Sequence, residues 1–248
     1  MSWLEDSTLE FQLWHDWPQN PNDAVKLQYE LKNEIDSSTT LGQPAVVAAV
    51  DTAFNSKYNR LYAAAVSLTY PDMGNFERAV AECETKFPYI PALLAFRVGP
   101  VILKALSRLT TKPDVVIYPG HGLAHPRACG MASHLGLITD IPSIGCARRS
   151  LTGDYRVPAS EKGSCSSLFV SDVEVGFVYR TKSNVKPIFI TPGHKCTIRD
   201  ALEIVISCLT EYRMPEPLRL AHLFANKYKQ SAERKMETMR SMAGKNTG

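Results

Sequence analysis

A nearly continuous apolar segment, residues 45–53 (AVVAAVDTA), constrains the fold most, because it contains a single acidic residue, Asp51. A run of this kind is typical of a strand buried on both faces of a sheet. An ionised carboxylate there costs roughly several kcal/mol unless it is paired or binds a cation. Asp51 therefore caps the following turn, pairs with a buried arginine, or holds a divalent metal ion of the kind that promotes phosphodiester hydrolysis.

Further strands and helices are predicted on both sides of this segment. Three strands in succession, followed by helices that alternate with strands, indicate an α/β fold with a mixed sheet flanked by helices. The first expected helix, at residues 24–35, has Asp23 as its expected cap. The second, at residues 91–109, contains Pro100, which predicts a kink or a restart of the helix. The other expected strands are residues 60–68, 79–85, 114–118, 143–147, 175–180 and 187–191, and the other helices are residues 127–137 and 197–212.

The composition is that of an ordinary globular chain of 248 residues, with 44% hydrophobic and 21% charged residues. A formal net charge of +3 does not by itself indicate a nucleic-acid-binding protein. The six cysteines form no CxxC pair and no zinc-ligand spacing, so we expect reduced thiols in a cytoplasmic or nuclear protein. The start of the chain is acidic (Glu5, Asp6) and lacks a signal peptide, and no stretch predicts a membrane span.

The distribution of polar, apolar and charged residues divides the chain into three predicted parts. Residues 1–44 are polar and form a helical extension, residues 45–220 form the main domain, and residues 221–248 form a basic tail. From Lys227 onward the tail has six Lys or Arg residues against two Glu. It is either a solvated, fraying terminus or an auxiliary segment that attracts phosphate.

A proline-bracketed loop, residues 87–91 (FPYIP), is the first candidate for binding beyond Asp51. Pro88 and Pro91 fix the backbone on either side of Tyr89 and Ile90. Such a loop either wedges its side chains between stacked bases or is a stiff connection whose tyrosine packs against the protein.

A glycine-rich loop, residues 119–126 (PGHGLAHP), is the second candidate. Gly120 and Gly122 flank His121 and allow the backbone to approach a ligand closely. His121 and His125 are four residues apart, but the intervening glycine disfavours a helix that would align them on a metal ion. A ligand-binding loop and a plain turn both remain open.

Arg148, Arg149 and His194 complete the candidates. The two arginines follow a predicted strand, where they either clamp phosphate oxygens or form a solvated basic turn. His194 precedes the predicted helix at residues 197–212 and is a metal ligand, a proton donor or a turn residue.

Read in order, these segments resemble the endonuclease V family over residues 45–219. The motifs that carry the resemblance are VDTAF around Asp51, the FPYIP loop, LLAFR ending at Arg97, GHGLAHPR (120–127), ASHLG (132–136), DIPSIGCAR (140–148), PGH ending at His194 and YRMPEPLR (212–219). Several such motifs in the right order are more specific than any one of them.

The resemblance implies a ribonuclease H-like fold with Mg²⁺ or Mn²⁺ as cofactor. Members of the family cleave DNA or RNA near inosine, at the second phosphodiester on its 3′ side. By resemblance, Asp51 is the first metal carboxylate, His194 and His125 keep family histidines, and Tyr89 is the tip of the wedge. The wedge, Ala92 and the glycine-rich loop would then contact a base turned out of its stack.

Four positions depart from the family pattern. The family's FRE glutamate is Val98, and its DGHG aspartate is Pro119, so two metal-ligand carboxylates are absent. The IGVAK lysine is Arg148, and the glycine after PYIP is Ala92. Asp114 lies five residues before Pro119, roughly 16 Å along a strand, which is too far to substitute for a ligand.

Three hypotheses follow. The first is a chain that binds single-stranded or inosine-containing RNA or DNA but has lost, or severely weakened, metal-dependent cleavage. The second is an active inosine-directed endonuclease that holds its metal through Asp51, His194, phosphate and water, or through a relocated carboxylate. The third is a protein-interaction module that has kept only the scaffold.

Overall fold

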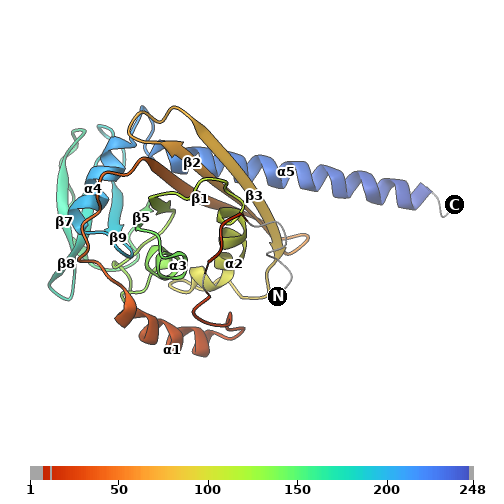
Figure 1. Ribbon diagram of the computed structural model, residues 1–248, viewed down its shortest axis with the longest axis horizontal. Coiled ribbons are helices and arrows are strands. Elements are labelled where there is room, and N and C mark those ends of the chain that lie inside the picture. Colours follow the sequence, from red (N-terminus) through yellow and green to blue (C-terminus); the bar gives the residue numbers. More distant parts are fainter. Residues whose placement is uncertain (1–7, 12, 246–248) are drawn as a thin grey trace.

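A mixed sheet is the centre of the molecule (Figure 1). The structure, a computed structural model, describes residues 8–11 and 13–245. Within these residues nine strands form one sheet in the order β3-β2-β1-β4-β5-β9-β8-β7-β6. The strands are β1 (Val46–Asn55), β2 (Arg60–Thr69), β3 (Phe76–Glu84), β4 (Val115–Tyr118), β5 (Ser143–Ala147), β6 (Asp154–Tyr155), β7 (Cys165–Val170), β8 (Val173–Tyr179) and β9 (Ile188–Pro192).

The direction of the strands explains why the ends of β1, β4 and β5 meet. β1, β4 and β5 run parallel, whereas β2, β3, β8 and β9 pair antiparallel to their neighbours. Parallel neighbours bring their carboxyl ends to the same edge of the sheet. The loops that follow these three strands are therefore neighbours, although they are far apart in the sequence.

Helices cover both faces of the sheet. Alternate residues of β1 point to opposite faces, so Ala48 and Val50 pack against α2 (Leu94–Leu106) and α3 (Met131–Thr139). Val47 and Ala49 pack against α4 (Ile198–Ser207) and the start of α5 (Glu216–Lys245). The expected mixed α/β sheet flanked by helices is confirmed.

The polar N-terminal part packs onto this core. Helix α1 (Pro21–Leu31), followed by the short 3₁₀ helix η1 (Lys32–Glu34), buries Leu31 against Cys129 and Leu137. The predicted cap, Asp23, is wrong: the helix begins three residues earlier, where the Asn20 side chain accepts a hydrogen bond from the Asp23 N–H. Glu5 and Asp6 lie outside the described residues.

Helix boundaries account for most differences from the expected elements. Pro100 lies inside α2, which nevertheless continues to Leu106. The helix expected at residues 127–137 begins at Met131, because the chain around His125 is folded into turns. The helix expected at residues 197–212 ends at Ser207. The strands β6 and β7 were not predicted.

The basic tail predicted from residue 221 does not begin as a separate segment, because residue 221 lies within a helix that packs on the sheet. Helix α5 begins at Glu216 and buries Ala221 and Ala225 against the sheet. The Tyr228 ring then packs edge-on against Tyr62 of β2. The later part of α5 extends away from the body of the molecule (Figure 1). Within the described residues, no helix is both long and apolar enough to cross a membrane.

Candidate functional site

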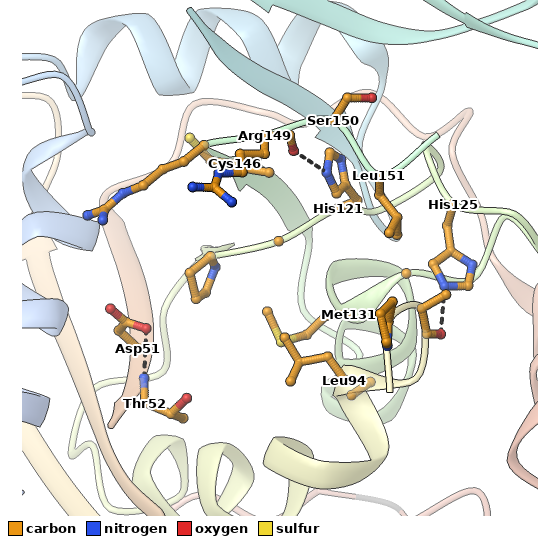
Figure 2. A pocket seen from close by; sticks show the side chains of 18 of the residues that line it. Asp51, Thr52, Leu94, His121, His125, Met131, Cys146, Arg149, Ser150 and Leu151 are labelled. Atoms are coloured by element: carbon orange, nitrogen blue, oxygen red, sulfur yellow. Dashed lines mark hydrogen bonds between the residues drawn. The ribbon is translucent and has the colours of Figure 1, made fainter. Parts of the chain in front are cut away.

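A pocket of about 480 Å³ opens at the carboxyl ends of β1, β4 and β5 (Figure 2). The strand registers pair Ala49 with Ile117 and Ile117 with Ile144, so two residues further along Asp51, Pro119 and Cys146 lie side by side. All three line the pocket. Much of the remaining wall comes from the proline-bracketed loop, the glycine-rich loop, the arginine pair and the first turns of α5.

Asp51 is paired with a residue that the sequence did not indicate, His222 of α5. The His222 Nδ1 lies 2.7 Å from the Asp51 carboxylate, and the Thr52 N–H donates to the same carboxylate over 2.8 Å. Burial raises the pKa of Asp51, while the hydrogen bonds from Thr52 and His222 and the charge of Arg148 oppose that shift. Asp51 is therefore neither a turn cap nor the partner of a buried arginine, but one half of a carboxylate–imidazole pair.

A signal for His222 was present in the chain. Leu218, the last apolar residue of the YRMPEPLR motif, lines the pocket, and His222 follows it by four residues. Residues four apart lie on one face of a helix. The assignment of residues 221–248 to a tail hid this relation.

One of the two positions without the family carboxylate, Pro119, lines the pocket with Asp51, and the other, Val98, lies outside the pocket lining. Pro119 is beside Asp51 in the pocket wall, and Val98 of α2 is buried in the same apolar cluster as Val50. Asp114 accepts hydrogen bonds from the N–H groups of residues 45 and 46 at the opposite end of β1. Glu82 faces Arg60 at 3.5 Å. Neither acid replaces a lost ligand.

The pocket does not have the ligands that a magnesium or manganese site requires. These cations take several oxygen ligands, and magnesium requires them in near-octahedral geometry. Asp51 is the sole acid among the described residues that line the pocket. In the described part of the chain, no group of three or more His, Cys, Asp or Glu side chains could hold a metal ion.

The proline-bracketed loop forms one rim of the pocket. Ile90, Pro91 and Ala92 line the pocket together with Tyr89, whose side chain is 70% exposed. The Tyr89 ring is thus free of the protein core and available to another molecule. Pro88 is exposed and lies outside the pocket lining.

The glycine-rich loop contributes Gly120, His121 and His125 to the pocket. His121 Nε2 donates to the Arg149 carbonyl over 2.9 Å, and burial lowers the pKa of His121 (Figure 2). The hydrogen bond places a proton on Nε2, and burial favours the neutral form of the imidazole.

Gly122, which was predicted to contact nucleic acid, lies outside the pocket lining and packs against β9 instead. A Cβ atom on Gly122 would lie 1.9 Å from the Pro192 carbonyl oxygen. The Gly122 N–H donates to the Thr191 hydroxyl over 2.8 Å. This glycine is needed for the close approach of the loop to β9.

Arg148 and Arg149 follow β5 and line the pocket with exposed side chains. Arg213 donates from Nη2 to the Arg148 carbonyl over 2.9 Å and to the Pro187 carbonyl over 2.8 Å. The backbone of the arginine pair is thereby fixed, while both guanidinium groups are directed to solvent at the pocket. Against Asp51 alone, they make the pocket electropositive.

His194 is not part of this pocket, so its predicted place beside Asp51 is wrong. β9 runs antiparallel to β5, with Ile144 opposite Pro192, which carries the chain to the end of β5 remote from Cys146. There the Asp36 N–H donates to His194 Nδ1 over 3.1 Å, and Asp140 lies 3.6 Å from His194 Nε2. His194 anchors the segment that follows α1.

Comparisons with known proteins agree on one family. The sequence model of the Endonuclease V family matches residues 29–223. A curated relative from Methanothrix thermoacetophila, named endonuclease V, is 43% identical over 219 residues, which are 88% of this chain and 96% of that protein. A relative of the same name from Dictyoglomus thermophilum is 40% identical over 205 residues, 83% of this chain and 89% of its own length.

Solved structures give the same answer for the fold. The endonuclease V of Streptomyces avermitilis superposes with a TM-score of 0.82 at 35% identity and covers 88% of this chain and 96% of its own. A Ciona intestinalis endonuclease V, solved with a DNA that contains an inosine followed by a ribo-adenosine, has a TM-score of 0.69 at 25% identity and covers 85% and 98%. The ribonuclease H-like fold implied by the motifs is confirmed, and this chain belongs to the endonuclease V family.

Proposed function

We propose that this chain binds inosine-containing RNA or DNA in the pocket and has lost, or severely weakened, metal-dependent cleavage of the strand. The observation that carries the proposal is the acid content of the pocket. Asp51 is the sole carboxylate among its described lining residues, and Val98 and Pro119 occupy the positions where the family pattern has two more.

Without those two carboxylates, the pocket is better suited to bind a phosphate than to activate water. A phosphodiester is attracted by Arg148 and Arg149, whose guanidinium groups can donate to two phosphate oxygens at once. Cleavage needs a cation that neutralises the phosphate and activates water, and the residues present do not fit such a cation. We therefore derive no hydrolytic step for this chain.

In this proposal, the two rims of the pocket, the proline-bracketed loop and the side of His121, recognise the base. Tyr89, exposed at the tip of its loop, would enter the gap left by a displaced base and stack on the neighbouring base. The displaced base would lie between that loop and His121, in the space bordered by Gly120 and Met131. Support for inosine as the base comes from the family and from the inosine-containing DNA of the Ciona relative.

Fluorescence anisotropy with matched oligonucleotides tests the binding half of this proposal. Single strands of RNA and DNA carry either one inosine or one adenosine at the same position, and each is titrated at several salt concentrations without divalent metal. The expected result is tighter binding of the inosine strand, with an affinity that falls as salt rises. Equal and salt-independent binding of all strands would leave only a scaffold function.

A further inference from the structure

The turn that ends the proline-bracketed loop contains a residue in a strained conformation. Ile90 to Leu93 form a turn closed by the Leu93 N–H, which donates to the Ile90 carbonyl over 3.1 Å. Pro91 is the second residue of the turn, and Ala92, the third, has a φ of 64°. A proline followed by a residue with positive φ is the pattern of a type II turn, where glycine is preferred at the third position. An alanine persists there only where its surroundings hold it.

Three side chains hold the Ala92 carbonyl. Gln28 Nε2 donates to this oxygen over 3.0 Å, His125 Nε2 over 2.8 Å and Arg127 Nη2 over 3.2 Å. A carbonyl oxygen has two lone pairs and usually accepts at most two hydrogen bonds, so three donors are more than it normally has. Rotation of the Ala92 backbone away from positive φ would break all three hydrogen bonds.

Gln28 is the centre of this network and has no free hydrogen-bonding group. Its second amide hydrogen is donated to the Cys129 carbonyl over 2.9 Å, and its Oε1 accepts from Arg127 Nε over 2.6 Å. The side chain is 1% exposed and lines the pocket. Because the nitrogen faces two carbonyl groups and the oxygen faces a guanidinium, only one orientation of the amide fits.

His125 is oriented by the same network. Its Nδ1 accepts from the Arg127 N–H over 3.2 Å, so its Nε2 carries the proton that Ala92 receives. The donor and the acceptor of each hydrogen bond in the network are therefore defined. Gln28, which connects these groups, comes from α1, outside the predicted main domain.

We infer that Gln28 is a positioning residue: its amide, delivered by α1, holds Ala92 at positive φ and so presents Tyr89 to nucleic acid in a preset position. The inference deepens the proposed function and rests on it for its role in binding. It assigns to the N-terminal extension a direct part in the site. Fixing a loop before the ligand arrives raises affinity because less freedom is lost on binding.

Amide hydrogen exchange in the free protein tests the clamp without nucleic acid. Gln28→Ala should speed exchange of the segment 87–94 at least tenfold. In an Ala92→Gly background, where positive φ carries no strain, the same substitution should change exchange less than threefold. Equal factors in both backgrounds would overturn the inference, because loss of a merely structural contact is not rescued by a glycine at the turn.

Leu31→Ala is the matched control for a structural effect. Leu31 is buried on α1 in a cluster with Cys129 and Leu137, so Leu31→Ala opens a cavity there and leaves the three side-chain donors to the Ala92 carbonyl in place. Its effect on segment 87–94 should be the same with and without Ala92→Gly. Glu30→Ala, exposed on the same helix, should change nothing.

A fluorescent base links the clamp to function. 2-Aminopurine placed 3′ to inosine becomes more fluorescent when it is unstacked. At saturating protein, Gln28→Ala should lower the fluorescence plateau at least twofold. The double variant Gln28→Ala/Ala92→Gly should recover the wild-type plateau. A plateau that is unchanged in Gln28→Ala would overturn the positioning role. If the wild-type protein produces no brightening and does not prefer inosine, the proposed function fails, while the exchange experiment still decides the clamp.

Discussion

Replacement of Tyr89 by alanine separates the wedge from the rest of the binding surface. The Tyr89 side chain is 70% exposed, so its removal takes little from the folded protein. Surface substitutions of this kind usually change the free energy of unfolding by about 0.5 kcal/mol or less. Stacking of one base on an aromatic ring contributes about 1–3 kcal/mol. Tyr89→Ala should therefore weaken the Kd for an inosine-containing strand roughly 5- to 150-fold, with an unchanged Tm.

The assay is anisotropy at three or more salt concentrations. Because Tyr89 carries no charge, the slope of log affinity against log salt should stay the same while the affinity falls. Tyr29→Ala is the control, since Tyr29 is 53% exposed on α1 with Lys32 over its ring and lies outside the pocket. A loss of less than twofold for Tyr89→Ala, or an equal loss for Tyr29→Ala, would refute the wedge.

The remaining predictions concern charge, packing and protonation. Arg148→Ala and Arg149→Ala should each lower the salt slope by about 0.7 if the guanidinium contacts one phosphate of a single strand, and unchanged slopes would exclude them as phosphate ligands. Gly122→Ala should lower the free energy of unfolding, measured in urea, by about 3 kcal/mol, because the new Cβ would lie 1.9 Å from the Pro192 carbonyl oxygen. An unchanged free energy of unfolding would mean that the loop moves freely. Burial raises the pKa of Asp51 above its usual 3.8, so the stability that the neutral carboxyl provides is present below pH 3.8 and is lost as pH rises through the folded pKa. Asp51→Asn should therefore have no stability advantage at pH 3.5 and a clear one at pH 7, and the reverse order in a series of thermal melts would contradict the assignment.

Much of the sheet could be predicted because its central strands are continuous apolar runs. β1 and β4 are buried on both faces, and no other element suits such short apolar segments. β6 and β7 were missed because they carry exposed polar residues at the far edge of the sheet. The start of α3 was misplaced because every residue of that helix is buried, so it has no amphipathic period.

The site was harder to predict because it depends on strand direction. Asp51 and the loop residues Tyr89, His121 and Arg148 could be selected from the sequence, and the structure brings them to one pocket. His194 could not be excluded without knowing that β9 runs antiparallel to β5.

Two further residues were missed for related reasons. His222 was hidden because α5 was taken for a tail from residue 221 onward, although Ala221 and Ala225 show the four-residue spacing of a buried helix face. Gln28 gave no signal at all, since a glutamine on a polar helix is ordinary until its partners are known.

Cleavage of an inosine-containing strand is the most direct test of the central claim. End-labelled RNA and DNA strands are incubated with excess wild-type protein, first in Mg²⁺ and then in Mn²⁺, beside Asp51→Ala as the control for a contaminating nuclease. We predict that the inosine strand is bound and stays intact over many times the duration of a normal enzymatic turnover. A product cut at the second phosphodiester 3′ to inosine, formed at turnover rates and abolished by Asp51→Ala, would contradict it.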